Sequence, residues 1–122
     1  MNQNVLNDFV KEIKTKYKNI VQDLKLEYID EPGNVHIYLV LIKIKKSQRE
    51  RGYGNSVLSD LIVLADNHHI KIRLWITNVY GSDLDRLAAF YMRHGFIHIP
   101  GFNDGEMMYF PKKKDKRKTE IS

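Results

Sequence analysis

The stretch that decides the fold is Arg49-Glu50-Arg51-Gly52-Tyr53-Gly54-Asn55-Ser56-Val57-Leu58, which follows an apolar alternating run and opens an amphipathic one. Glycine at positions 52 and 54 allows positive φ angles and removes Cβ atoms, so consecutive backbone N–H groups can converge on an anion where the next helix begins. This turn therefore predicts a binding site for a phosphate or pyrophosphate. An ordinary helix start without a ligand is the alternative, because two glycines in a basic turn occur in both settings.

The flanking segments supply the strand and the helix on either side of this turn. Residues 36–44 read His-Ile-Tyr-Leu-Val-Leu-Ile-Lys-Ile, an almost wholly apolar run typical of a central strand covered on both faces. After the turn, apolar residues recur at helical spacing, namely Val57, Leu58, Leu61, Ile62 and Ala65. We therefore expect a strand over 35–45 and a helix over 55–67.

The rest of the chain predicts two further helices and four further strands. The helices are an amphipathic one over 4–20, which covers one sheet face, and one from Asp83 to His94, capped by Asp83 and ended by Gly95. The strands are 24–28, joined to 35–45 by a turn at 30–34, then 70–77, and 96–99 and 107–110 around a turn at 100–105. A helical connection between 35–45 and 70–77 favours a right-handed parallel crossover. The order α-β-β-α-β-α-β-β indicates a mixed α/β (α+β) domain.

Composition narrows the class of protein. With 122 residues, 43% hydrophobic and 29% charged, the chain reads as one soluble globular domain, which we place at residues 1–111. No apolar run approaches the ~20 residues that span a bilayer, and the N-terminus lacks the basic and apolar regions of a signal peptide, so we expect a cytoplasmic protein away from membranes. Zero cysteines exclude disulfides, thiolate metal sites and a cysteine nucleophile. The adjacent His68 and His69 lack a suitably spaced third ligand, so no metal is expected.

The positive charge is concentrated at the C-terminal end. Residues 112–122 contain six basic and two acidic side chains, a net +4 of the chain's +5. Such a basic tract with few apolar residues is typical of a solvated, disordered tail, and the alternative is an arm that binds a polyanion. The body of the chain therefore gives little reason to expect nucleic-acid binding except through this tail.

Two motifs, in order, resemble those of the GCN5-related N-acetyltransferase family. Arg49-x-x-Gly52-x-Gly54 matches the family's Gln/Arg-x-x-Gly-x-Gly/Ala motif, and Ala89-Phe90-Tyr91-Met92-Arg93-His94-Gly95-Phe96 looks like its Phe-Tyr-x-x-x-Gly-Phe segment. The match covers roughly residues 35–110. It implies a compact single-domain member of the family, with a mixed central sheet, a splayed pair of parallel strands and about three flanking helices.

The resemblance also implies a cofactor site. In that family two adjacent parallel strands splay apart at a bulge, and acetyl-coenzyme A lies between them; here these are 35–45 and 70–77. Backbone groups of Ile42, Lys43 and Ile44 would pair with the pantetheine arm, and amides of Arg51, Gly52, Tyr53, Gly54, Asn55 and Ser56 would hold the pyrophosphate. Four basic residues would add positive charge near the phosphates, with solvation beside the loop as the other role of each: Lys45, Lys46, Arg49 and Arg51. Phe90 would lie beside the cofactor, with packing as its other role.

The reaction that the resemblance implies is direct attack of a neutral amine on the acetyl thioester, without a covalent enzyme intermediate. The backbone N–H of Ile44 would stabilise the oxyanion, and the Tyr91 hydroxyl would protonate the leaving thiolate. Packing in the core is the alternative role of Tyr91. The acceptor would be a small-molecule amine, a protein lysine or an N-terminus, since small relatives include virus-borne enzymes and an anti-CRISPR protein that acetylates a lysine on its target. A homodimer is common among relatives.

The chain departs from the family pattern in two places. Val40 and Leu41 lie where many relatives carry a glutamate that acts as general base, so the base is left open. His36, His94 and Glu106 are candidates by residue type only, and solvent can instead remove the proton. Leu84 replaces the family's frequent asparagine, which weakens one expected cofactor contact.

Two other functions stay open at this point. A nucleic-acid-binding module that uses the basic tail predicts salt-dependent binding that is lost when residues 112–122 are deleted. A non-catalytic coenzyme A-binding or interaction domain predicts cofactor binding with no acyl transfer to any amine.

Overall fold

The computed structural model describes residues 1–77, 83–99 and 105–112. Along these residues run α1 (Gln3–Lys16), β1 (Val21–Glu31), β2 (Asn34–Ile44), the short 3₁₀ helix η1 (Lys46–Gln48), α2 (Tyr53–Asn67), β3 (Lys71–Trp75), α3 (Leu84–Arg93), β4 (Ile97–His98) and β5 (Glu106–Tyr109). The strands form one sheet in the order β1-β2-β3-β5-β4, in which β2 and β3 are parallel and the other neighbours antiparallel. The predicted mixed α/β fold and the parallel pairing are confirmed.

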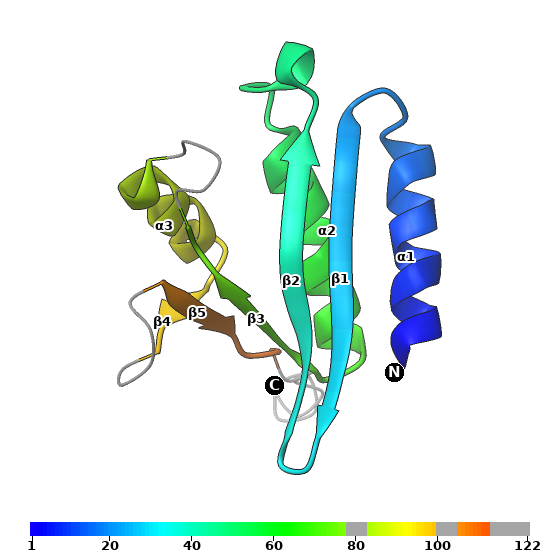
Figure 1. Cartoon of the computed structure of the whole chain (residues 1–122), viewed down its shortest axis with the longest axis vertical. Helices are drawn as coiled ribbons and strands as arrows, with labels where there is room; N and C mark the ends of the chain where they lie inside the picture. The colour runs from blue at the N-terminus through cyan, green and yellow to red at the C-terminus, as the bar shows by residue number, and fades with distance from the viewer. Residues whose placement is uncertain (78–82, 100–104, 113–122) are drawn as a thin grey trace, which may run out of the picture.

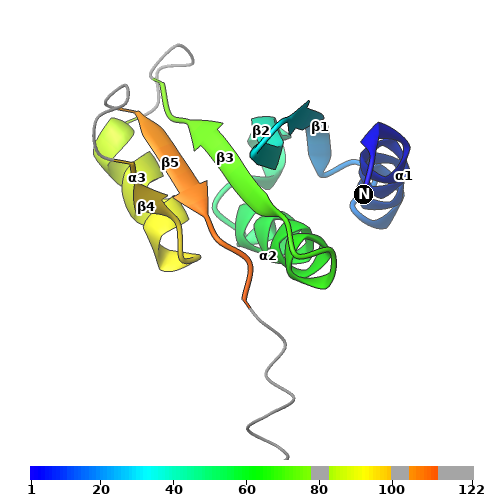
Figure 2. The same ribbon diagram turned by 90° about the horizontal axis from the view of Figure 1, so that it is seen from below.

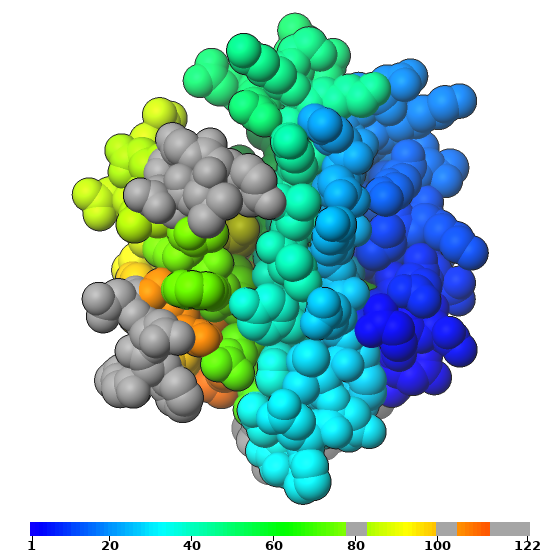
Figure 3. Space-filling view, viewed as in Figure 1, coloured from blue at the N-terminus to red at the C-terminus, as the bar shows by residue number. Residues whose placement is uncertain are grey.

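The helices cover one face of the sheet (Figures 1 and 2). α2 lies behind β2, α3 lies beside β4 and β5, and α1 lies along the outer edge of β1. The core fills the space between this face and the helices, with Leu6 and Ile13 from α1, Leu58 and Leu61 from α2, and inward-facing strand residues such as Ile72. Among the described residues, no helix covers the opposite face, which Figure 3 presents to the viewer.

The β1–β2 hairpin is longer and tighter than predicted. Strand pairing runs to Glu31 opposite Asn34, so the turn consists of Pro32 and Gly33 alone, with Gly33 at φ 73°. A two-residue hairpin turn needs positive φ, which glycine supplies without strain. The predicted strand over 24–28 was therefore too short, and the predicted turn over 30–34 too wide.

The first helix ends earlier than predicted. The helix expected over 4–20 ends at Lys16. At its other end, the Asn2 side chain caps the helix by accepting a hydrogen bond from the Val5 N–H. Asn19 has φ 65°, and the Val21 N–H already bonds the Tyr17 carbonyl, so the chain reverses into β1. The helical spacing of apolar residues predicted too late an end for the helix, because Tyr17 and Ile20, which lie in this turn, still pack against the core.

β2 and β3 separate halfway along their length. Their parallel pairing ends at Leu39 opposite Leu74. At the same level β1 pairs Leu26 with Leu39 and Lys25 with Leu41, which leaves Val40 as an extra, bulged residue. Beyond Val40, β2 continues to Ile44 while β3 turns away from it (Figure 1). The splayed parallel pair expected from the sequence is thus present.

The two helices that flank the splayed strands begin near their predicted residues. α2 begins at Tyr53, two residues before the predicted start, and Gly52 is its N-cap residue with φ 81°. Gly54 lies inside the first helical turn, so it does not use the positive φ that glycine permits. Asp83 caps α3 as predicted, because its carboxylate accepts from the amides of Asp85 and Arg86.

α3 and the last strands differ from the prediction in burial and length. None of the side chains of α3 is fully buried, because Phe90 and Tyr91 pack against the core only in part and its other apolar residues line cavities. β3 is shorter than the predicted 70–77, since its ladders with both neighbours end by Trp75. β4 and β5 cover 97–98 and 106–109 rather than 96–99 and 107–110.

Two predicted segments lie largely outside the described residues. These are the turn at 100–105, apart from Gly105, and the basic tail beyond Lys112. Lys112 itself is tied to α2, because its backbone N–H donates to the Asp66 carboxylate at 2.9 Å. Across the described ranges, no helix is both long enough and apolar enough to cross a membrane.

Candidate active site

The gap between the splayed strands is a cavity of about 120 Å³. Its walls come from the bulged part of β2, the end of β3 and α3, namely Leu39, Val40, Leu41, Ile42, Leu74, Trp75, Ile76, Thr77, Leu87 and Tyr91. The bulge and the end of the parallel ladder leave backbone groups of β2 here without a neighbouring strand on that side. An extended ligand can therefore pair with this edge as a strand would.

Tyr91 is the polar side chain that α3 contributes to this cavity. Within the described part of the chain its hydroxyl has no hydrogen-bond partner, and no buried side-chain oxygen or nitrogen there is left without one. The hydroxyl must therefore reach the open cavity. Burial raises the pKa of Tyr91 to about 12, so at neutral pH the group is protonated and acts as a hydrogen-bond donor.

A second cavity, of about 260 Å³, lies at the N-terminus of α2. It is lined by Ile44, Gln48, Arg49, Glu50, Gly52, Tyr53, Gly54, Asn55 and Phe90. Gly52 caps α2 without a side chain, and a Cβ built on it would meet no atom within 4 Å. The first-turn amides of α2 therefore open onto free space with the positive end of the helix dipole behind them, a suitable arrangement for an anion.

The charged residues near this cavity are placed differently from the sequence expectation. The Arg49 Nε donates to the Ile44 carbonyl at 3.1 Å, which holds the loop against the end of β2. Arg51 and Ser56 are exposed and are not among the lining residues, and neither is Lys43. Glu50, with φ 65°, does line the cavity and brings a negative charge that the sequence reasoning did not consider.

Phe90 and His94 connect α3 to the start of α2. The His94 Nε2 lies 2.9 Å from the Asn55 Oδ1, and the Phe90 ring packs edge-on against both Tyr91 and His94. A Cβ on Gly54 would lie 3.6 Å from the Phe90 Cζ, an ordinary contact. Phe90 therefore packs against its neighbours and also lines the cavity at the start of α2, and its role beside a cofactor stays a prediction.

The structure divides the predicted site residues between the two cavities. Ile42 and Tyr91 line the gap between the strands, whereas Ile44 lines the anion cavity with its carbonyl held by Arg49. The two residues predicted to act together on the acetyl group, Ile44 and Tyr91, therefore do not share a cavity. The sequence prediction missed four residues that line the gap. Strand register and the bulge determine their positions, and neither leaves a recognisable pattern in a single sequence. The four are Leu39, Leu74, Trp75 and Leu87.

The three candidate bases are occupied elsewhere. The His36 Nδ1 bonds the Asn34 carbonyl at the hairpin, Glu106 holds Arg73, and His94 holds Asn55. Among the described residues that line the gap there is no carboxylate or imidazole. In residues 1–77, 83–99 and 105–112 there is no group of three or more histidine, aspartate or glutamate side chains that could hold a metal ion.

Comparison with solved structures identifies the fold. The chain resembles AtaT in the AtaT–AtaR complex bound to DNA, with a TM-score of 0.57 and 16% identity over 71% of this chain. The Y144F mutant of the toxin AtaT, bound to the C-terminus of the antitoxin AtaR and acetyl-CoA, gives a TM-score of 0.52 and 15% identity over the same share. The chain spans little more than half of these two proteins, 57% and 55% of their lengths.

Two further solved structures cover more of the chain. The KacTA–DNA complex gives a TM-score of 0.56 and 19% identity over 96% of this chain and 86% of the other. The histone acetyltransferase HPA2 and related acetyltransferase from Corynebacterium glutamicum ATCC 13032 gives 0.55 and 21%, over 88% and 75%. No protein-family model and no curated sequence matches the chain. At these identities the comparison shows the fold, which is that of the GCN5-related N-acetyltransferases.

Proposed function

We propose that this chain transfers an acetyl group from acetyl-CoA to a primary amine. One observation carries the proposal: the gap at the Val40 bulge, faced by the Tyr91 hydroxyl, lies beside an uncapped helix N-terminus that can hold an anion. A strand edge, a proton donor and an anion site side by side suit a ligand with an amide-containing arm, a thioester at one end and a pyrophosphate at the other. The acetyl-CoA bound to the AtaT mutant supports the choice of ligand.

In this proposal the first turn of α2 binds the pyrophosphate. The amides of Tyr53, Gly54 and Asn55 have no helical partner, and these residues line the cavity at the start of α2. The edge of β2 from Val40 to Ile44 then pairs with the pantetheine arm. Glu50 weakens anion binding at this end, and the helix dipole and the basic loop offset its charge.

The chemistry takes place at the gap between the strands. Bound acetyl-CoA supplies an activated thioester. The neutral amine nitrogen forms a bond to the carbonyl carbon while the carbon–sulfur bond breaks, and the amine's proton passes to water. A backbone amide between Val40 and Ile42, rather than that of Ile44, is our proposed donor to the oxyanion, because this part of β2 shares the cavity with Tyr91.

Tyr91 acts on the leaving group in this scheme. With a pKa of about 12 its hydroxyl stays protonated, so it donates a hydrogen bond and then a proton to the departing sulfur and regains a proton from water. No side chain that lines the gap in the described residues can serve as a base for the amine. Water at the open mouth of the gap therefore removes the proton of the acceptor ammonium before attack.

The test is thermal unfolding of the purified protein with and without acetyl-CoA. Ligand at about 100 times its dissociation constant adds about 2.7 kcal/mol to the free energy of unfolding. Gly54→Glu places a carboxylate in the anion cavity and should abolish this increase in stability, whereas Gly54→Ala adds only a Cβ in ordinary contact with Phe90 and should retain it. If acetyl-CoA stabilised the protein but no amine caused release of free coenzyme A, the chain would be a coenzyme A-binding domain and not an enzyme.

A further inference from the structure

The gap between the splayed strands is bordered from both faces of the sheet. Leu87 and Tyr91 border it from α3, on the face that carries the helices. Val40 and Trp75 follow the buried Leu39 and Leu74 in their strands, so alternation turns them to the other, helix-free face, where 44% and 54% of their surfaces are exposed. A cofactor held at the N-terminus of α2 occupies the helix side. The acceptor amine must then approach over Val40 and Trp75.

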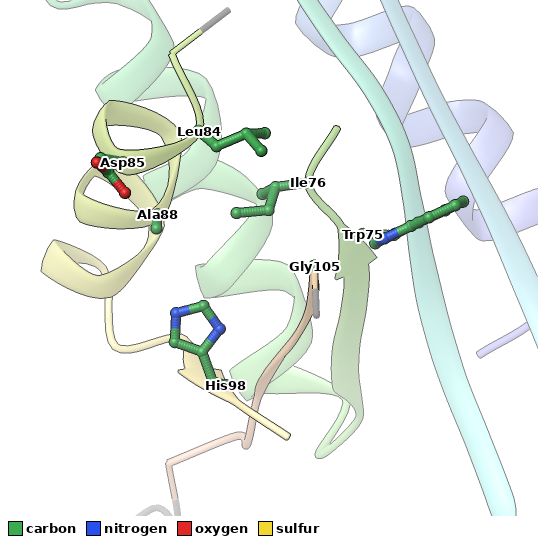
Figure 4. Close-up of a pocket in the computed structure, with 7 residues that line it drawn as sticks. All are labelled: Trp75, Ile76, Leu84, Asp85, Ala88, His98 and Gly105. Atoms are coloured by element: carbon green, nitrogen blue, oxygen red, sulfur yellow. The ribbon is translucent and has the colours of Figure 1, made fainter. Parts of the chain in front are cut away.

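Trp75 is held in place although it is exposed. A Cβ added to Gly105 would lie 2.5 Å from its Cδ1 and 2.6 Å from its Nε1, so the indole rests directly on the Gly105 backbone. The Ile76 N–H bonds the Gly105 carbonyl at 2.8 Å, which ties that backbone to the end of β3. In Figure 4 the ring extends away from the residues of α3 and toward β2, across the sheet. The indole can pack this closely on the backbone only because residue 105 is a glycine.

The surroundings of Trp75 define what it can bind. Val40 and Leu41 of β2 line the same gap as the ring and provide apolar surface there, whereas the Ile76 side chain points to the other side, toward α3. On the same face Arg73 and Glu106 bind each other through two hydrogen bonds of 2.7 and 2.9 Å, so the pair offers no net charge to a ligand. An exposed indole face attracts an alkyl chain by its apolar area and an ammonium group by its quadrupole. None of these residues attracts a carboxylate or a sugar, and Asp85 and His98, which line another cavity with Trp75, lie on the side from which the ring points away.

From this geometry, and given the acetyl transfer proposed above, we infer that Trp75 determines acceptor specificity. Its ring receives the unbranched alkyl chain of a primary amine, either a lysine side chain or a free diamine, and directs the nitrogen into the gap beside Val40. Trp75 lies one residue beyond Leu74, the last residue of β3 paired with β2, so the ring is next to the point where the strands separate. It contacts the acceptor and takes no part in proton transfer.

The experiment uses the fact that the chain contains a single tryptophan. With the protein saturated with coenzyme A, which cannot donate acetyl, tryptophan emission is followed while pentylamine, cadaverine, a lysine-containing peptide and glucosamine are added. We expect a saturable change with the first three and none with glucosamine. In steady-state assays, Trp75→Ala should raise KM for the accepted amines about tenfold, with a smaller change in kcat and unchanged acetyl-CoA affinity.

Trp75→Phe keeps an aromatic ring and should hold KM within about threefold of the wild type. A peptide KM well below that of cadaverine identifies a protein lysine as the source of the amine, and the reverse identifies a diamine. Unchanged emission at amine concentrations that saturate the rate, or an unchanged KM in Trp75→Ala, overturns the inference. The latter result leaves the acetyltransferase proposal standing, whereas a wild type that binds neither acetyl-CoA nor amines overturns both.

Discussion

The two halves of the β2–β3 pair differ in how completely their polar groups are satisfied. In the paired half, His36–Leu39 and Lys71–Leu74 form a continuous ladder, and Arg73 and Glu106 bind each other beside it. In the splayed half, β2 beyond Leu39 has no ladder to β3, the first turn of α2 has no side-chain cap, and no partner of the Tyr91 hydroxyl is found among the described residues. One half holds the sheet together, and the other is where we propose that a ligand binds. Each prediction below tests that division.

Arg73→Met should have the largest effect, and on stability alone. It leaves the Glu106 carboxylate, 7% exposed, without its bidentate partner, which should cost about 3 kcal/mol of unfolding free energy. Denaturant unfolding measures this cost. Lys14→Met, which breaks the exposed pair of Lys14 with Asp23, is the control and should cost under about 1 kcal/mol. If folded Arg73→Met lost its affinity for acetyl-CoA, the two halves would not be separable.

Tyr91→Phe and Tyr109→Phe form a matched pair, because both hydroxyls have a pKa of about 12. Burial alone raises that of Tyr91, whereas Tyr109 also donates to the Asp66 carboxylate at 2.8 Å. We expect Tyr91→Phe to lower kcat about a hundredfold, or about 2.7 kcal/mol, without weakening acetyl-CoA binding.

Tyr109→Phe should instead cost about 1 kcal/mol of stability and leave kcat unchanged. Rates and unfolding curves for both variants separate the two roles. Equal losses of kcat in the two variants would mean that Tyr91 acts only through packing, which is the alternative role that its sequence position left open.

Much of the paired half follows from the sequence. Alternating apolar residues predicted β2, the helical period predicted α2 and α3, and a helix between two apolar strands predicted their parallel order. The splay itself could only be expected from the family resemblance. Its cause is the register shift at Val40, and register depends on tertiary contacts that periodicity does not encode. For the same reason the strand predicted over 70–77 gave no indication that Trp75 lines a cavity.

For the proposed anion site, the local backbone was easier to predict than the surrounding side chains. The glycine turn was found directly from residue types, because the left-handed N-cap at Gly52 is a local requirement of the chain. Which side chains surround it was less predictable. Arg49 turns back to the Ile44 carbonyl, and Arg51 stays in solvent, since long cationic side chains have many rotamers and local contacts choose among them.

Gly52→Ala and Gly33→Ala compare the same change in the two halves. Both glycines have positive φ, 81° and 73°, and both face open space within 4 Å, so each alanine should cost about 1 kcal/mol of stability. Only at Gly52 does the added methyl enter the proposed phosphate site, where acetyl-CoA affinity should fall about tenfold. Calorimetric titration measures both affinities. Equal affinities in the two variants would argue against an anion at the start of α2.

The smallest effect concerns the two partly or fully buried histidines, one in each half. Desolvation lowers the pKa of both His36 and His94. Positive charge nearby lowers each pKa further: Arg73 and Lys71 act on His36, and Arg93 acts on His94. The unfolded chain therefore binds more protons than the folded one just below pH 6.5, so stability is complete above that pH and declines as pH falls through it. Both histidines should contribute to this decline, which unfolding curves between pH 5 and 7 measure.

The pH dependence of acetyl-CoA affinity should distinguish His94 from His36. Its phosphates would lie near His94, which holds Asn55 at the anion cavity, and far from His36 at the hairpin. Protonated His94 would then attract the ligand, so the affinity of the wild type relative to His94→Gln should rise about threefold as pH falls from 7 to 5.5, the effect of one partly exposed charge. His94→Gln keeps a donor for Asn55 but cannot take up the proton. It is the reference because the second pKa of a phosphate monoester is about 6, so the charge of the ligand changes equally in both proteins over this range. His36→Gln should retain the wild-type dependence, and a loss of that dependence in His36→Gln instead would place the ligand at the paired half.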